Sequence, residues 1–393
     1  MAKPKLFHAL GLHMHQPPDN LRLLIESDPR EAERIIRCYE RVPRYIRRFR
    51  DCAHIHVGFS GILLEQLRDP DIVDSYRGII DIPAMLEAYA DAQSIELVGM
   101  GYYHPIFPLI PREDWEDHLI RGREIIKETF GRAPRGFWPS KLAFCIDMIP
   151  AVAKAGYQYV IVDDMRLRRH GEMADICRPY RLTVDDASIV VIPRDSELSE
   201  AQAQGTDPQS FSRAVQSRLQ NVTPAHPPRL ITTWSDGENG GWFRQMHEQS
   251  GFFGHFFAPL MEVVQAGGSP VVPVSLSDFI AENPPVADPD VCLAGGTPHA
   301  GVAVADRALA SAEEAAVAQV RALSARYRDL RSSAGDLPPE VRAALDEARR
   351  LILEAETSCF LSWDDEWREK LYDRTRLAEA LLDQATAKRG ARQ

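Results

Sequence analysis

The sequence lacks an excess of positive charge, closely spaced cysteines and a long apolar run. Its 393 residues carry a formal net charge of −11, which disfavours a general nucleic-acid binder, because phosphate contacts need a basic surface. Its six cysteines include no C-x-x-C pair, so neither a zinc ribbon nor a disulfide framework is indicated. We expect free, mostly buried thiols.

Membrane and export signals are also missing. No run approaches the ~20 apolar residues that a membrane span needs. The apolar run near the N-terminus is short, is broken by His8 and Gly11, and leads into histidine and proline instead of a small-residue cleavage site. We therefore expect a cytoplasmic protein with no membrane partner, and the acidic charge is compatible with a neutral sugar polymer as ligand.

Short apolar segments alternate with amphipathic ones over the first 280 residues. Segments rich in Val, Ile and aromatics predict buried strands, whereas those with apolar residues at helical spacing predict helices. The expected strands are Lys5–Leu12, His54–Gly58, Ile95–Met100, Gly136–Trp138, Tyr157–Val162, Ser188–Ile192, Leu230–Trp234 and Val271–Val274, and the expected helices are Glu31–Phe49, Trp115–Phe130, Asp147–Ala155 and Phe252–Ala266. This alternation predicts a parallel α/β fold, either a barrel or a doubly wound sheet.

The composition changes near Pro284. A Pro/Gly-rich stretch ends the alternation there, and no strand is expected beyond it. The helical segments Arg307–Leu330, Pro339–Ala355 and Glu366–Ala387 follow. We predict a barrel domain over residues 1–283, and a linker with a helical C-terminal subdomain over residues 284–393.

Functional groups of parallel β/α folds gather where strands end. His13 and His15 follow the first strand and alternate, so both face the same side of an extended chain. Tyr102 and Tyr103 follow the third strand beside Gly101. They make either a sugar-stacking platform or ordinary packing contacts.

Carboxylates follow two further strands. Asp163 comes directly after a buried apolar strand, where partial desolvation tunes a general acid. Asp236 and Glu238 lie in a glycine-rich loop that ends in Trp242, and such loops let the backbone approach a ligand. A calcium loop is the competing interpretation, but the regular oxygen spacing is missing.

Together, these strand-end segments resemble glycoside hydrolase family 57. The similarity covers nearly the whole chain, and its strength lies in the order of the motifs. The matching segments are His15-Gln16-Pro17, Gly101-Tyr102-Tyr103-His104-Pro105, Gly136-Phe137-Trp138-Pro139, Tyr159–Asp163, Leu230–Trp242, and in the tail Glu356-Thr357-Ser358-Cys359 with Trp363 and Trp367.

The resemblance implies an irregular (β/α)7 barrel and retaining action on α-glucans, with no metal or other cofactor. Retention uses a carboxylate nucleophile and an acid/base carboxyl ~5–5.5 Å apart. Asp163 falls at the acid/base position. The nucleophile position of the W-x-x-E pattern falls on Lys141, which departs from the family, and Met165 and Arg166 stand where a histidine often follows the acid/base.

A sugar-binding role is expected for the polar and aromatic side chains of these segments. The candidates are His13, His15, Gln16, Tyr102, Tyr103, His104, Trp138, Trp242 and Trp363.

Two hypotheses keep the carbohydrate ligand. In the first, the chain is an α-glucan hydrolase or transferase, and Asp236 or Glu238 replaces the missing nucleophile. That carboxylate would activate water in an inverting mechanism, with the carboxyls ~6.5–9.5 Å apart. In the second, the chain is a non-catalytic relative that binds oligosaccharide or regulates a partner, as Lys141 suggests.

The third hypothesis is a metal-dependent hydrolase such as a polysaccharide deacetylase. In it His13, His15 and a carboxylate, Asp163 or Asp236, hold a divalent ion. The H-Q-P context of the histidine pair fits family 57 better.

Overall fold

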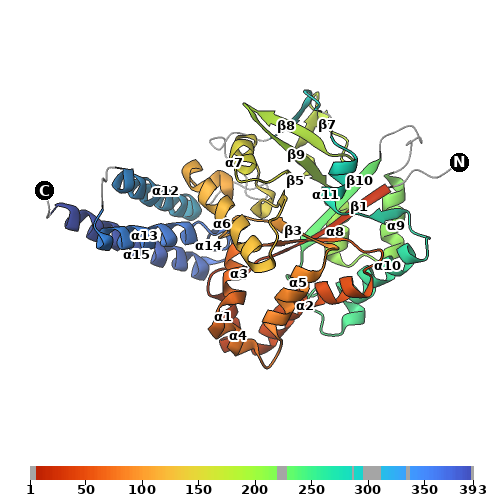
Figure 1. The fold of residues 1–393 in the computed structure, drawn as a ribbon, viewed down its shortest axis with the longest axis horizontal. Helices are drawn as coiled ribbons and strands as arrows, with labels where there is room; N and C mark the ends of the chain where they lie inside the picture. Colours follow the sequence, from red (N-terminus) through yellow and green to blue (C-terminus); the bar gives the residue numbers. More distant parts are fainter. Residues whose placement is uncertain (1–5, 219–227, 286, 295–310, 333–336, 391–393) are drawn as a thin grey trace.

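A computed structural model describes residues 6–218, 228–285, 287–294, 311–332 and 337–390 of the chain (Figure 1). The predicted strands and helices all lie at least partly within these ranges, and residues 307–310 of the predicted helix Arg307–Leu330 lie outside them.

Seven parallel strands form the central sheet. They are β1 (Leu6–Met14), β2 (Ile55–Phe59), β3 (Ile95–Gly99), β4 (Gly136–Phe137), β5 (Tyr159–Asp163), β9 (Ala187–Arg194) and β10 (Arg229–Asp236). Their order is β10-β1-β2-β3-β4-β5-β9, and each neighbouring pair is parallel. The outer strands β9 and β10 approach each other, and Asp195 N–H at the end of β9 donates to Thr232 C=O of β10 at 2.8 Å. The chain therefore has the irregular (β/α)7 barrel that the resemblance implies.

Further strands extend this barrel. β8 (Tyr180–Val184) pairs antiparallel with β9, and β11 (Val271–Pro273) pairs with the first residues of β1. β6 (Leu167–Arg169), β7 (Glu172–Met173) and β12 (Val291–Leu293) form a small separate sheet. The expectation of no strand beyond Pro284 is wrong at β12, because this three-residue segment gains its strand geometry by pairing with β6, far away in sequence.

Helices cover the outside of the barrel (Figure 1). Aspartate and serine residues begin many of them: Asp28, for example, accepts the backbone N–H of Glu31, and Ser60 that of Leu63. The helices of this part are α1 (Asn20–Ser27), α2 (Pro29–Arg48), α3 (Gly61–Arg68), α4 (Pro70–Tyr76), α5 (Ile82–Asp91), α6 (Arg112–Phe130), α7 (Ile149–Lys154), α8 (Ser196–Gln204), α9 (Pro208–Ser217), α10 (Ala258–Gln265) and α11 (Leu276–Glu282).

The C-terminal helices project to one side of the barrel (blue in Figure 1). They are α12 (Ser311–Ser332), α13 (Pro339–Ala355), α14 (Ser358–Ser362) and α15 (Asp365–Gly390). Their apolar faces share a core that also takes in Ile106 and Leu109 from the loop after β3. Buried polar contacts add to this attachment, since Arg349 pairs with Asp114 of α6 at 2.7 Å and His118 of α6 with Glu356 at 2.7 Å.

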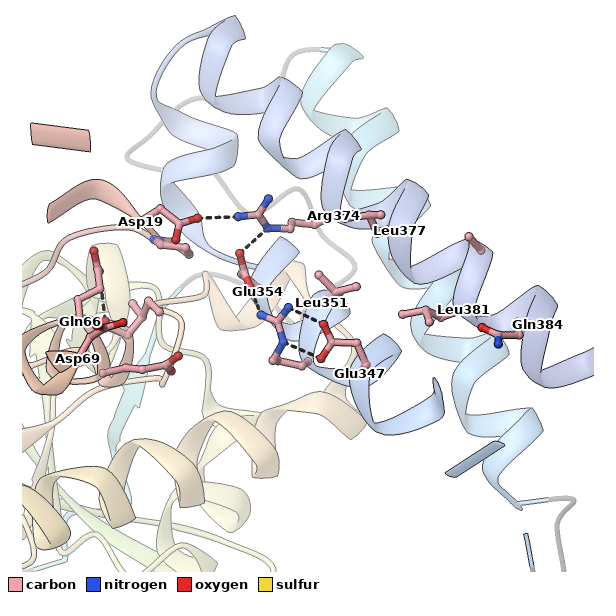
Figure 2. A pocket seen from close by; sticks show the side chains of 15 residues that line it. Asp19, Gln66, Asp69, Glu347, Leu351, Glu354, Arg374, Leu377, Leu381 and Gln384 are labelled. Carbon is pink, nitrogen blue, oxygen red and sulfur yellow. Dashed lines mark hydrogen bonds and ion pairs between the residues drawn. The ribbon is translucent and has the colours of Figure 1, made fainter. Parts of the chain in front are cut away.

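A groove of about 530 Å³ separates α13 and α15 from the start of α1 and from α3 (Figure 2). At one end Arg374 of α15 bridges Asp19 at 2.8 Å and Glu354 at 2.5 Å, and Glu354 also accepts from Arg350. These ion pairs tie the helical region to the loop that follows β1.

The cysteines are free, and most of them are buried, as predicted. None of the described helices is both long enough and apolar enough to cross a membrane.

Candidate active site at the carboxyl ends of the strands

The ends of β1, β4 and β10 bring three predicted site residues together. His13 stands in register with Asp236, and its Nε2 lies 3.7 Å from Asp236 Oδ2. The His13 ring stacks on Trp138 with centroids 5.1 Å apart, and Trp138 in turn stacks on Trp234 at 5.0 Å. Trp138 is only 3% exposed, so His13 and Asp236 are the more accessible members of this group.

His15 and His104 lie deeper, with their rings stacked 3.9 Å apart. Both ring nitrogens of His15 have partners, Ser60 Oγ at 2.8 Å and Cys359 Sγ at 3.2 Å. Nδ1 of His104 bonds Ser358 Oγ at 2.8 Å. Burial lowers the pKa of both histidines well below the ordinary value, so both imidazoles are neutral near pH 7.

Glu238 is buried beneath the loop that carries Asp236. Its Oε1 accepts the backbone N–H of His15 at 2.6 Å. Burial, and then the charge of Asp236, raise the pKa of Glu238 well above its usual range. Glu238 thus anchors the β1 loop from a buried position, whereas Asp236 reaches solvent.

Asp163 ends β5 and stands in register with Arg194 of β9. Its Oδ1 accepts from the backbone N–H of Met165 at 2.9 Å and from the Ser196 hydroxyl at 3.4 Å. Arg194 is nearly buried; it donates to Trp234 C=O at 2.8 Å and to Ser196 at 3.4 Å. A chain of hydrogen bonds therefore runs from Asp163 to the end of β10, where Asp236 begins its loop.

The neighbouring Asp164 is buried and accepts from Ser196, and burial raises its pKa. Sequence reasoning missed Asp164, Ser196 and Arg194. A second carboxylate directly after Asp163 was the available signal, whereas nothing local marks Ser196 and Arg194, which reach the site only through the pairing of β5 with β9.

Lys141 lies three residues after Trp138, in a short turn beyond β4. Its side chain is exposed. It lies close enough to the histidines that, after burial, its charge is a further cause of the lowered pKa of His15 and His104. Lys141, which the resemblance places at the nucleophile position, therefore lies near the strand ends as a cation.

The two tyrosines point away from this group. Tyr102 is 8% exposed and its hydroxyl donates to Glu65, while the Arg121 guanidinium lies 4.3 Å from its ring centroid. Tyr103 is 1% exposed. The sequence left open whether the two tyrosines form a sugar-stacking platform or ordinary packing contacts, and the contacts described here are packing contacts.

The remaining candidates are spread out. Gln16 is buried and accepts from Asn20 at 2.5 Å. Trp242 is half-buried, with its ring centroid 5.7 Å from that of His255. Trp363 is 42% exposed and packs edge-on against Trp367 at 4.8 Å. Among the predicted aromatic ligands within the described ranges, Trp363 is the one with a broad accessible face.

The C-terminal tail contributes to the site. An antiparallel bridge between Pro105 and Thr357 brings α14 against the loop after β3, which places Ser358 and Cys359 on the histidine pair. The tail motif marked this segment as part of the family pattern, although the contacts of its residues could not be predicted from the sequence.

The predicted metal ligands do not assemble. Within the described ranges, no three His, Cys, Asp or Glu side chains are arranged to hold a metal ion. His15 in particular has both ring nitrogens engaged.

Solved structures share this architecture. A branching enzyme from Pyrococcus horikoshii superposes with a TM-score of 0.70 at 15% identity, covering 96% of this chain and 88% of that one. An α-amylase from Thermotoga maritima superposes with a TM-score of 0.71 at 14% identity, covering 99% and 94%. The fold and its polar strand ends thus define a protein of the (β/α)7-barrel class.

Sequence comparison gives the family. The model of glycosyl hydrolase family 57 matches residues 22–290, more than half of the chain, and the chain belongs to this family. Alpha-amylase 1 of Dictyoglomus thermophilum is 30% identical over 197 residues, which are 49% of this chain and 26% of that protein. A 4-alpha-glucanotransferase of Thermococcus litoralis is 25% identical over 256 residues, 63% of this chain and 35% of that protein. The matches thus span about a quarter to a third of these relatives.

Proposed function

We propose that this protein binds an α-glucan at the carboxyl edge of its barrel and breaks a glycosidic bond there. The observation that carries the proposal is the pair of accessible carboxylates at the ends of β5 and β10, Asp163 and Asp236. Ser196 and Arg194 connect Asp163 to the backbone of Trp234, two residues before Asp236. The family and the named activities of the two relatives support an α-glucan as the substrate.

The proposed roles follow from burial and charge. Asp163 donates the proton to the leaving oxygen, and Asp236, beside His13, activates water. Glu238 does not attack the sugar, because it is buried and engaged by the backbone N–H of His15, and burial raises its pKa, which disfavours the carboxylate. Lys141 cannot replace a carboxylate nucleophile, since its ammonium has no lone pair to offer. The proposed reaction is inverting hydrolysis, which requires the two carboxyl groups to lie ~6.5–9.5 Å apart.

The first experiment is a product assay on maltoheptaose, soluble starch and glycogen. We expect Asp163→Asn to lower turnover by about 10²–10⁴-fold. Asp71→Asn is the matched control, because Asp71 lies in the first turn of α4 and its side chain is 79% exposed. Newly released reducing ends should be β-anomers by NMR. A retained α-anomer would rule out the inverting assignment.

A second candidate is a non-catalytic carbohydrate-binding relative, and Lys141 is the observation that favours it. It predicts glucan binding with no product on long incubation, and the same affinity in Asp163→Asn. Turnover that depends on Asp163 would exclude it.

Two further expectations belong to this proposal. Free, mostly buried thiols support a reducing, cytoplasmic location. The division of the chain at residues 283 and 284 stays a prediction, and β12 attaches the segment after Pro284 to the barrel side.

A further inference from the structure

A buried polar contact joins the helical region to the barrel. The side chains of His118 in α6 and of Glu356, the residue after α13, are fully buried, and His118 Nε2 lies 2.7 Å from Glu356 Oε2. One turn earlier in α6, Asp114 pairs with Arg349 of α13 at 2.7 Å. Buried pairs of this kind add little net stability, because desolvation of the polar groups offsets their attraction. Stability alone therefore does not account for Glu356.

Glu356 begins a tail segment (residues 356–359) that reaches the strand ends. Thr357 forms an antiparallel bridge with Pro105. The backbone N–H of Ser358 donates to the His104 carbonyl at 3.2 Å, and Ser358 Oγ bonds His104 Nδ1 at 2.8 Å. Because only one residue separates Glu356 from Ser358, any movement of Glu356 would disturb both contacts with His104.

The backbone of His104 is held in an unusual conformation. Its φ is 58°, in the left-handed region that non-glycine residues rarely adopt. Its N–H donates to the Gly101 carbonyl at 2.8 Å, and its own carbonyl accepts from Ser358. Such a conformation persists only where the surroundings over-determine it, and the tail segment supplies part of that restraint.

The tail segment also contacts the other member of the buried histidine pair, His15 and His104. Cys359 Sγ lies 3.2 Å from His15 Nε2. The two rings of the pair stack 3.9 Å apart, and the His104 ring lies 6.4 Å from the nearly parallel ring of the more accessible His13. A hydrogen bond to one ring nitrogen sets which nitrogen carries the proton. The tail segment therefore sets the orientation and the hydrogen bonding of two imidazoles behind His13.

We infer that Glu356 is a positioning residue: held by His118, it places Ser358 and Cys359 against the buried histidine pair. Its side chain is 1% exposed, so any effect on a ligand passes through the two imidazoles. The effect on the imidazoles is independent of the proposed function, whereas an effect on turnover rests on it.

The first test is the NMR spectrum of the full chain with isotope-labelled histidines. We expect Glu356→Ala to shift the ring-nitrogen signals of the buried histidine pair. Glu356→Gln should keep them close to those of the wild type, because glutamine can still hydrogen-bond to His118.

Glu354→Ala is the matched control for this spectrum. Glu354 is a glutamate of α13 that is 4% exposed, but it pairs with Arg350 and Arg374 on the groove side. We expect it to leave the signals of the buried histidine pair unchanged. Unchanged signals in folded Glu356→Ala, or equal shifts in both alanine variants, would overturn the inference.

Alkylation of Cys359 is the second test. Cys359 is 2% exposed, so it reacts only when the tail segment opens. We expect Glu356→Ala to speed its alkylation by about tenfold or more, the change expected when a buried hydrogen bond is lost. Cys177 is the control within the same digest, because it is equally buried but lies in the barrel core. Equal rates for Cys359 in the variant and the wild type would overturn the inference.

A second variant covers the case in which Glu356→Ala does not fold. His118→Asn removes the same contact from the side of α6, because the shorter side chain does not reach Glu356. The same shifts of the buried histidine pair and the same faster alkylation of Cys359 are expected, and their absence would overturn the inference.

Turnover of maltoheptaose separates this inference from the proposed function. If the wild type hydrolyses maltoheptaose, we expect Glu356→Ala to lower kcat more than it changes KM, and Glu356→Gln to recover kcat. Shifted histidine signals in Glu356→Ala, with neither binding nor turnover in the wild type, would keep the inference and overturn the α-glucan assignment. Turnover in the wild type with unshifted signals in Glu356→Ala would keep the assignment and overturn the inference.

Discussion

The strand ends have two unlike sides. On the buried side, formed by His15, His104, Trp234 and Glu238, every side chain is less than a tenth exposed. On the open side, formed by His13, Lys141, Asp163 and Asp236, each side chain reaches solvent. Polar residues of the same motif, such as His13 and His15, therefore serve two purposes: the buried side holds the loops in place, and the open side is available to a ligand.

We expect the largest loss of stability when the side chain of Trp234 is removed. Its ring is fully buried and packs between Trp138 and His56. We expect Trp234→Ala to lower the free energy of unfolding by about 3–5 kcal/mol, the usual cost of a large core truncation. Denaturant titration measures this loss. Trp363→Ala is the control, because Trp363 is 42% exposed; equal losses in both variants would contradict the assignment of Trp234 to the buried side.

Substitutions of Glu238 test the buried side with a smaller expected loss of stability. Glu238→Ala leaves the His15 N–H without its acceptor, and we expect a loss of about 1–3 kcal/mol in the free energy of unfolding. Glu238→Gln keeps an acceptor and should lose less at neutral pH.

The contribution of Glu238 to stability should also depend on pH. The raised pKa of Glu238 means that the folded chain keeps a proton that the unfolded chain releases above about pH 4.3. The stability given by the protonated form is therefore present below that pH and is lost as the pH rises toward the folded pKa. Glutamine does not ionise, so the difference in the free energy of unfolding between Glu238→Gln and the wild type should shift in favour of Glu238→Gln as the pH rises above about 4.3. If the difference in the free energy of unfolding between Glu238→Gln and the wild type did not change with pH, Glu238 would already be ionised in the folded protein.

The open side should hardly affect stability. Lys141→Gln and Asp236→Asn are each expected to change the free energy of unfolding by less than about 1 kcal/mol, because exposed ion pairs and surface groups contribute little. The same denaturant titration measures both. A loss of several kcal/mol in either variant would move that residue to the buried side.

The parallel α/β fold was predictable from the sequence because its strands are local apolar runs, whereas the choice of a barrel came from the resemblance to family 57. β5, for example, reads Tyr-Val-Ile-Val-Asp with four buried residues and a half-buried aspartate at its end, so both the strand and the position of Asp163 follow from the pattern. The helix Pro339–Ala355 was predicted with the bounds that the structure has.

The features that could not be predicted depend on contacts between residues far apart in the sequence. Nothing local shows that Glu238 lies beneath His15, that Cys359 reaches the histidine pair, or that β12 pairs with β6. The adjacent residues Tyr102 and Tyr103 likewise gave no sign that they would contact Glu65 of α3 and Arg121 of α6.

A crystal structure of the protein with maltoheptaose would show where the sugar binds. We expect the sugar to lie on the open side, with a glycosidic oxygen within hydrogen-bond reach of Asp163 and a sugar ring against His13. A chain held at another surface, such as the groove between Asp69 and Leu381 in Figure 2, with the strand ends empty, would contradict it.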